Sequence, residues 1–248
     1  MPMINAAGGP VAYLDEGDGP PIVLLHGIQG TARTWDRVAQ ALVPHYRVVR
    51  PDLRGRGQSH TPAGAGAYRM PDFADDLDAT LAMIGRPAVV VAWSMAVSVT
   101  LELLLGRCPA TLPRALVLVS GTPFVGTEAR WFAGSSADEV AQEAQARAIA
   151  LALSESAAPH AVAASWQQVQ QADYRARLNA ITLPTLVVHG VDDDQCPLSH
   201  GRLMAQTIPG ARMVEWDATG HNPMARDPAR FAAAIDAFVA SLPPPVSH

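Results

Sequence analysis

Short apolar runs and longer amphipathic segments alternate along this chain. The runs at 89–91 and 115–119 contain no polar residue, which is typical of strands buried on both faces of a parallel sheet. Further strands are predicted at 21–25, 46–49, 185–189 and 211–216, and helices at 34–42, 70–84, 199–207 and 228–241. Residues 1–20 predict two antiparallel edge strands. This alternation predicts an α/β fold: a mostly parallel sheet of about eight strands with helices on both faces.

Residues 122–180 interrupt the alternation. This segment is rich in alanine, contains no predicted strand, and predicts helices near 136–153 and 159–172. Ser136 and Glu139 have the spacing of a capping box at the start of the first of these helices. A helical insertion between two sheet strands is typical of a cap over a site. Plain packing of the segment on the side of the sheet is the alternative.

We therefore expect one α/β core with an inserted helical cap. The core comprises residues 1–121 and 181–248, and the cap comprises residues 122–180. A chain of 248 residues is a common length for a single α/β domain. Residues 242–248 are rich in proline and are expected to form a loose tail.

Composition narrows the classes of partner. Apolar residues make up 49% and charged residues 17%, a balance typical of a globular protein. The formal net charge is −5 and no basic block occurs, so neither nucleic acid nor a membrane surface is expected as a partner. No signal-peptide pattern and no run of about 18 apolar residues occurs, so we expect a cytoplasmic protein. Cys108 and Cys196 lie far apart and are expected to be unpaired thiols.

The sharpest local signal is a single serine between a strand and a helix. Ser94 follows the apolar run at 89–91 and precedes an apolar segment of helical length, which is the layout of a nucleophile elbow. The usual elbow reads Gly-x-Ser-x-Gly, whereas Ala92 and Ala96 stand at the glycine positions here. Alanine is the next smallest residue, so both positions are compatible with the turn. Val97 stands where another small residue is usual, so less space is left at the start of the helix.

Two more reactive residue types follow predicted strands. The run Asp192-Asp193-Asp194 follows the strand at 185–189, and His221 follows the strand at 211–216. Carboxyl ends of parallel strands meet at one edge of a sheet, where reactive groups collect. A serine hydroxyl needs an adjacent base, and the base needs an orienting acid. The chain supplies serine, aspartate and histidine in the order of the α/β-hydrolase triad.

The resemblance to a family rests on motifs that occur in sequence. They are His26-Gly27, Asp52-x-Arg54-Gly55-x-Gly57-x-Ser59, the elbow, His189-Gly190-x-x-Asp193-x-x-x-Pro197 and Gly220-His221. The chain resembles the serine-nucleophile branch of the α/β-hydrolase fold family over essentially its whole length. The resemblance implies that Ser94 is the nucleophile, His221 the general base and Asp193 the acid, whose place is set by its spacing from Gly190 and Pro197.

The same resemblance nominates the groups around the triad. The oxyanion hole is expected from the backbone N–H groups of Ile28 and Met95. Gln29 is expected to face the pocket. Trp93, Phe124, Trp131 and Phe132 are candidates for an apolar substrate pocket under the cap, and core packing is the alternative for each of these aromatic residues.

The function implied is hydrolysis of a carboxylic ester through an acyl-enzyme, with no metal and no cofactor. A shortage of charged residues near the expected pocket favours a small to medium, largely apolar ester. The elbow with the stretch Ser120-Gly-Thr-Pro-Phe124 is similar to methyl esterases that act on pimeloyl esters of acyl carrier protein. The few arginines of residues 122–180 argue against docking of that acidic partner. Two alternatives stay open: a lactonase or C–C bond hydrolase of the same fold, and a non-catalytic hydrolase-fold receptor or accessory protein.

Overall fold

The computed structural model describes residues 1–107, 109–150, 153 and 155–244. Cys108 and the end of the expected tail, 245–248, lie outside these residues. Cys196 is a buried free thiol. No helix of the described residues is both long and apolar enough to cross a membrane.

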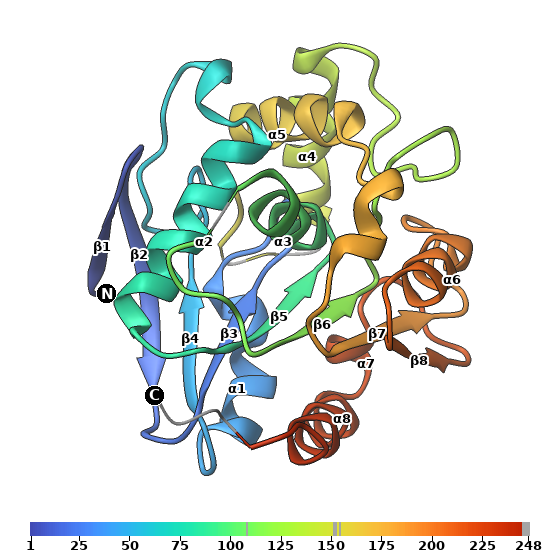
Figure 1. The fold of residues 1–248 in the computed structure, drawn as a ribbon. Helices are drawn as coiled ribbons and strands as arrows, with labels where there is room; N and C mark the ends of the chain where they lie inside the picture. The colour runs from blue at the N-terminus through green and yellow to red at the C-terminus, as the bar shows by residue number, and fades with distance from the viewer. Residues whose placement is uncertain (108, 151–152, 154, 245–248) are drawn as a thin grey trace.

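Within the described residues, eight strands form one sheet in the order β1-β2-β4-β3-β5-β6-β7-β8 (Figure 1). The strands are β1 (Met3–Ala6), β2 (Gly9–Glu16), β3 (Pro21–Leu25), β4 (Arg47–Pro51), β5 (Val89–Trp93), β6 (Ala115–Val119), β7 (Thr185–Gly190) and β8 (Arg212–Trp216). The β3–β4, β3–β5, β5–β6, β6–β7 and β7–β8 pairs are parallel. The β1–β2 and β2–β4 pairs are antiparallel. The predicted α/β class and the mostly parallel sheet are confirmed.

Alternate residues of the central strands serve two hydrophobic cores, one on each face of the sheet. Val90 and Ala92 of β5 pack into the core under α2 and α3, whereas Val89 and Val91 pack into the core under α1 and α8 (Figure 1). The helices are α1 (Asp36–Leu42), α2 (Met70–Ile84), α3 (Met95–Gly106), α4 (Ala137–Ala150), α5 (Pro159–Gln171), α6 (Leu198–Thr207), α7 (Pro223–Arg226) and α8 (Pro228–Ala240). Burial of both faces explains why β3, β5, β6 and β7 lack polar alternation.

The insertion between β6 and β7, residues 122–180, is called the cap segment below. Its helices α4 and α5 lie side by side (Figure 1). The predicted capping box is present: the Glu139 N–H donates to Ser136 Oγ at 3.2 Å, and the Ser136 N–H donates to Glu139 Oε2 at 3.2 Å. Three short elements escaped the sequence pattern: α7 and the 3₁₀ turns at Ala65–Ala67 and Arg175–Ala180. Each is too short to show a period.

Candidate active site

Ser94 lies in the tight turn between β5 and α3. Its backbone adopts φ 57° and ψ −121°, a conformation that side-chain-bearing residues rarely adopt. The turn is held by two backbone bonds: the Ser94 N–H donates to Val119 O at 2.9 Å, and the Val97 N–H donates to Ser94 O at 3.0 Å. Strain of this kind persists only where the surroundings fix it, and it clusters at functional sites.

Ser94, His221 and Asp193 form one continuous hydrogen-bonded row. His221 Nε2 lies 2.9 Å from Ser94 Oγ, and His221 Nδ1 lies 3.0 Å from each carboxylate oxygen of Asp193. A carboxylate only accepts, so the Nδ1 atom carries the proton and Nε2 is free to accept the serine proton. The row therefore has the geometry of a nucleophile, a base and an orienting acid.

The carboxylate of Asp193 is buried and accepts several hydrogen bonds. Its side chain is fully buried, and its Oδ1 accepts the N–H groups of Gln195 at 2.9 Å and Cys196 at 2.8 Å. Burial opposes ionisation, but the hydrogen bonds from His221 and from these two N–H groups outweigh it and lower the pKa of Asp193. The flanking Asp192 and Asp194 are exposed.

His189 is the second histidine near the acid. Its ring is buried, and its Nε2 lies 2.8 Å from Cys196 O and 3.4 Å from Asp193 Oδ2. Burial lowers the pKa of His189, although the Cys196 carbonyl and Asp193 oppose this shift. His189 therefore packs beneath the loop of the acid, and His221 is the histidine that reaches Ser94.

The loop after β3 brings Ile28 to the serine. Gly27 makes this approach possible, because a Cβ at this position would lie 3.0 Å from the Trp93 ring and 3.1 Å from Ser94 Cβ. His26 braces the loop: Nδ1 bonds Gly27 O at 2.8 Å, and Nε2 accepts the Leu53 N–H at 3.0 Å. Burial lowers the pKa of His26 to about 3, so this histidine stays neutral.

Ile28 and Met95, the expected oxyanion donors, are both buried. Ile28 lines the same cavity as Ser94, and Met95 begins α3 directly after it. Within the described part of the chain, neither of their N–H groups has an intramolecular acceptor. Both donors are therefore free to bind an oxygen atom next to Ser94.

The cavity at Ser94 has a volume of about 250 Å³. Its lining comprises Ile28, Gln29, Gly30, Thr34, Trp93, Ser94, Arg147, Leu153, Glu155, Gln195, His221 and Asn222. Gln29 and Trp93 therefore lie where the sequence places them. Trp93 also donates its Nε1–H to His221 O at 2.9 Å, so it holds the backbone of His221 in place.

The other aromatic candidates lie away from the cavity lining. Phe124 stacks on His200, with ring centres 4.4 Å apart, and lies under the guanidinium of Arg175. Trp131 and Phe132 pack against Trp166 inside the cap segment, at ring distances of 5.2 Å and 5.9 Å. Their positions match the alternative of core packing.

Five polar cavity residues have no counterpart in the sequence prediction: Thr34, Arg147, Glu155, Gln195 and Asn222. Arg147 stacks on Phe132 and donates to Trp131 O at 2.6 Å, and Glu155 pairs with Arg33 at 3.1 Å. Gln195 lies close to Asp193 in the sequence, and Asn222 directly follows His221. This closeness is the signal from which both could have been predicted to line the pocket. The pocket is therefore less apolar than the sequence suggests.

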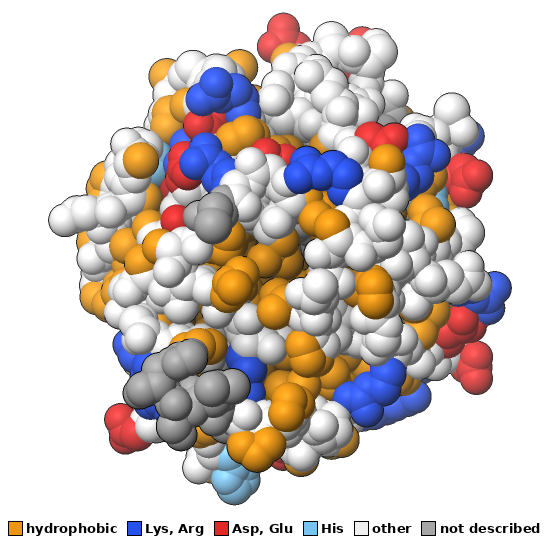
Figure 2. Space-filling model, in the orientation of Figure 1, with side chains coloured by type: hydrophobic (Ala, Val, Ile, Leu, Met, Phe, Trp, Pro, Cys, Tyr) orange, Lys and Arg blue, Asp and Glu red, His pale blue; other side chains and the backbone are white. Residues whose placement is uncertain are grey.

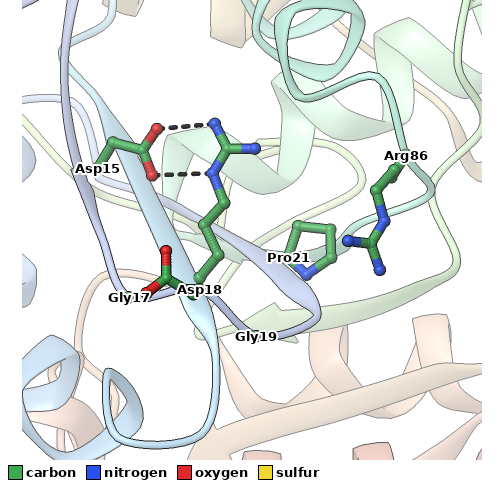
Figure 3. Close-up of a pocket in the computed structure, with 7 residues that line it drawn as sticks. Asp15, Gly17, Asp18, Gly19, Pro21 and Arg86 are labelled. Carbon is green, nitrogen blue, oxygen red and sulfur yellow. Dashed lines mark hydrogen bonds and ion pairs between the residues drawn. The ribbon is translucent and has the colours of Figure 1, made fainter.

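A larger hollow of about 470 Å³ lies at the opposite edge of the sheet, at the amino ends of the parallel strands (Figure 3). Asp15 and Arg47 form a bidentate ion pair there, and Arg86 lines the hollow beside Pro21. No nucleophile and base meet among its lining residues, so the reactive groups are at the smaller cavity. Within the described residues, no group of three or more His, Cys, Asp or Glu is placed to hold a metal ion.

Comparison with known proteins agrees with the fold. A profile of the Alpha/beta hydrolase family matches residues 22–234. The chain belongs to this family. The pimeloyl-[acyl-carrier protein] methyl ester esterase of Nitrosomonas europaea is 29% identical, with 90% of this chain and 96% of the relative covered. The corresponding esterase of Aromatoleum aromaticum is 28% identical, with 89% and 98% covered.

Solved structures show the same fold. An esterase from Exiguobacterium antarcticum superposes with a TM-score of 0.83 at 23% identity, over 96% of this chain and 99% of that chain. An esterase from Rhodococcus sp. ECU1013 superposes with a TM-score of 0.80 at 26% identity, over 97% of this chain and 98% of that chain.

This alpha/beta hydrolase accommodates an unusual elbow. Ala92 and Ala96 replace the glycines of the common pattern, and both are fully buried. Val97, which narrows the start of α3, fits because the facing residue is Gly121. A Cβ at position 121 would lie 2.2 Å from Val97 Cγ2.

Proposed function

We propose that this alpha/beta hydrolase cleaves carboxylic esters through an acyl-enzyme on Ser94. The observation that supports this most directly is the row from Asp193 through His221 to Ser94 Oγ, with each step at 2.9–3.0 Å. His221 takes the serine proton while Ser94 Oγ attacks the ester carbonyl carbon. The carbonyl electron pair moves to the oxygen, which the N–H groups of Ile28 and Met95 bind.

Collapse of this intermediate releases the alcohol, which takes the proton from His221. The acyl group stays on Ser94 until His221 removes a proton from water, and the resulting hydroxide attacks the acyl carbon. The bond from the acyl carbon to Ser94 Oγ then breaks, His221 returns the proton to Ser94 Oγ, and the carboxylic acid leaves. Asp193 holds the Nδ1–H tautomer throughout both halves of the reaction. Each step uses side chains or backbone groups of the chain, so the proposal includes no cofactor.

The cavity favours a small substrate that carries some polar groups. Its volume of about 250 Å³ is small for a ligand site, and its walls combine Ile28, Trp93 and Leu153 with glutamine, asparagine and charged side chains. We propose a short to medium ester with a polar group in either the acyl or the alcohol part. This adds a polar group to the largely apolar ester expected from the sequence.

A carrier-bound ester is the finer alternative, because two relatives are named for such a substrate. The cap segment contains six acidic residues against four arginines (Glu128, Asp138, Glu139, Glu143, Glu155 and Asp173; Arg130, Arg147, Arg175 and Arg177). On the face shown in Figure 2 the two signs are interspersed. An acidic carrier would gain little attraction from such a surface, so we propose a free ester.

Covalent labelling with a fluorophosphonate tests the nucleophile. The wild type is expected to be labelled, and Ser94→Ala is expected to lose both the label and hydrolysis of p-nitrophenyl esters, by about 10⁴-fold or more in kcat. Ser98→Ala is the matched control, because this buried serine on α3 bonds Thr122 O instead of a histidine. A wild type that is neither labelled nor active would contradict the proposal and favour a non-catalytic binding protein.

Substrate panels decide the bond that is cleaved. p-Nitrophenyl esters of increasing acyl length, a lactone and a vinylogous diketone are compared at equal concentration. Preference for a short ester supports the proposal, whereas cleavage of the lactone or of the diketone C–C bond with poor ester turnover would replace it. A methyl ester is then compared free and linked to acyl carrier protein, and higher kcat/KM for the linked form would contradict the free-ester assignment.

A further inference from the structure

Arg56 is a buried cation without a carboxylate partner. Its exposed fraction is 1%, and within the described residues no carboxylate oxygen lies within 4.0 Å of its guanidinium. Its neighbour Arg54, on the same turn after β4, is paired with Asp76 at 2.7 Å. Burying an unpaired charge is costly, so the contacts that hold Arg56 deserve an explanation beyond packing.

The guanidinium of Arg56 is satisfied by oxygen atoms around the oxyanion loop. Its Nε and Nη2 both donate to Ile28 O, at 3.1 Å and 2.8 Å, and Nη1 donates to Arg54 O at 2.8 Å. Nη2 also donates to Ser165 Oγ on α5 at 2.9 Å. The same nitrogen lies 4.0 Å from Met95 Sδ. Arg56 thus contacts both residues, Ile28 and Met95, whose N–H groups are the expected oxyanion donors.

The cap segment holds the next residue of the same loop. The Ala157 N–H donates to Gln29 O at 3.2 Å, and Gln29 Nε2 donates to Ala144 O on α4 at 2.9 Å. The Ala158 N–H donates to Gly55 O at 3.1 Å, beside Arg56. The carbonyls of Ile28 and Gln29 are therefore both fixed, one by Arg56 and one by the cap segment.

We propose that Arg56 is the positioning residue of the oxyanion hole, and that Ser165 links it to the cap segment. The two bonds to Ile28 O fix the loop so that the Ile28 N–H points at the reacting oxygen. The guanidinium charge, buried nearby, stabilises the anionic tetrahedral intermediate more than the neutral ester. This inference rests on the proposed ester hydrolysis and adds a group that does not itself touch the substrate.

The protonation state agrees with this role. Burial lowers the pKa of Arg56 to about 10, and Tyr68 and Asp76 oppose the shift. The side chain is therefore a cation at neutral pH. Phe73 covers one side of it, with the guanidinium carbon 5.2 Å from the ring centre.

The test compares Arg56→Gln with Arg50→Gln. Arg50 is also a buried arginine, but it bonds Asp36, Glu16 and Ala32 O, away from the oxyanion loop. For each folded variant, kcat and KM are measured with a short p-nitrophenyl ester, together with the affinity for a phenylboronic acid. The boronate forms an anionic tetrahedral adduct on a reactive serine, so it reports on the oxyanion hole.

In Arg56→Gln, kcat and boronate affinity are expected to fall together by on the order of 10- to 100-fold, with KM changed by less than about threefold. Arg56→Lys restores the charge with fewer bonds and is expected to regain part of both quantities. Arg50→Gln is expected to lower Tm while kcat and boronate affinity stay at wild-type values. Wild-type kcat and boronate affinity in folded Arg56→Gln would overturn the inference.

Should Arg56→Gln fail to fold, Arg56→Lys and Ser165→Ala provide the same measurements. Ser165→Ala removes only the acceptor on α5 and is expected to lower kcat and boronate affinity by about threefold to tenfold. Wild-type values in both variants would overturn the inference. A wild type that is labelled by fluorophosphonate and that prefers short p-nitrophenyl esters over the lactone and the diketone supports the proposed function whatever the outcome for Arg56, so the two failures are distinguishable.

Discussion

At the carboxyl edge of the sheet, each candidate catalytic group follows a strand directly, whereas the cap segment reaches the same cavity through long side chains. Ser94 follows β5, and Asp193 and His221 lie in the loops after β7 and β8. Arg147 and Glu155 come from the cap segment, whose described residues form no strand. The starting point of a loop at the edge is set by strand pairing, such as Trp93 with Val119. The direction of a cap side chain depends on how two helices rotate and pack.

The part of the site that follows the strands is determined by local sequence, whereas the part in the cap segment is not. A strand of the sheet is paired in register with its neighbours, so its end cannot slip by one residue without moving every side chain to the other face. A pair of packed helices has no comparable register. The sheet therefore determines where Ser94, Asp193 and His221 lie, and the packing of the cap segment determines the shape of the cavity.

The largest expected effect comes from changing Asp193, one of the residues at the carboxyl edge of the sheet. Asp193→Asn replaces an acceptor by an amide that donates to His221 Nδ1, and this favours the wrong tautomer of the histidine. We expect kcat with a p-nitrophenyl ester to fall by about 10⁴-fold while the fold is retained. The exposed neighbours give matched controls: Asp192→Asn and Asp194→Asn are expected to stay within about twofold. A comparable loss in either control would move the role of the acid away from Asp193.

An effect of intermediate size concerns stability at the edge. His26 has a pKa of about 3 in the folded chain, because it is buried, against about 6.5 when unfolded. Between these values the unfolded chain binds one more proton, so stability is lost as the pH falls from about 6.5 toward 3. His26→Gln keeps an acceptor for the Leu53 N–H but cannot bind this proton. The slope of unfolding free energy against pH is expected to decrease by up to about 1.4 kcal/mol per pH unit.

Urea unfolding at several pH values measures this slope. His45→Gln, at an exposed histidine, is the control and is expected to keep the wild-type slope. An unchanged slope in His26→Gln would show that His26 is protonated in the folded chain, and the brace on the oxyanion loop would then need a different account.

The smallest expected effect separates cap packing from substrate contact. Trp131 donates to Cys196 Sγ at 3.3 Å and packs on Trp166, outside the cavity lining. Trp131→Phe is expected to cost about 1 kcal/mol of stability and to change KM for a short ester by less than about twofold. Leu153→Ala, in the cavity lining, is the matched variant and is expected to raise KM by a few-fold. A larger KM effect at Trp131 than at Leu153 would return Trp131 to the substrate pocket.

The sequence allowed prediction of the strands, most helices and the meeting of Ser94, Asp193 and His221. These features depend on local periodicity and on the end of each strand, both of which are visible in a chain of residues. The roles of these residues in catalysis remain predictions that the variants above test. Asp193 was distinguished from its flanking aspartates by spacing alone, and the structure places only this one against His221.

The direction of the cap side chains was beyond prediction. Phe124 turns away from the cavity because Pro123 O accepts the Tyr174 N–H at 2.9 Å and Phe124 itself pairs with Asp173, which joins the two ends of the cap segment. Contacts of this kind link residues far apart in sequence and leave no period. Arg56 was hidden for a related reason, since its partners Ile28 and Ser165 lie on distant segments.

The contact between Val97 and Gly121 carries an evolutionary consequence. One position is bulky because the other has no side chain, so the two residues constrain each other's history. A relative with glycine or alanine at position 97 is free to carry a side chain at position 121, and the order of the two changes matters: shrinking position 97 must come first. Alignments of close relatives are therefore expected to show these positions covarying, and a mutational library that varies position 121 while Val97 is kept will sample mostly misfolded chains.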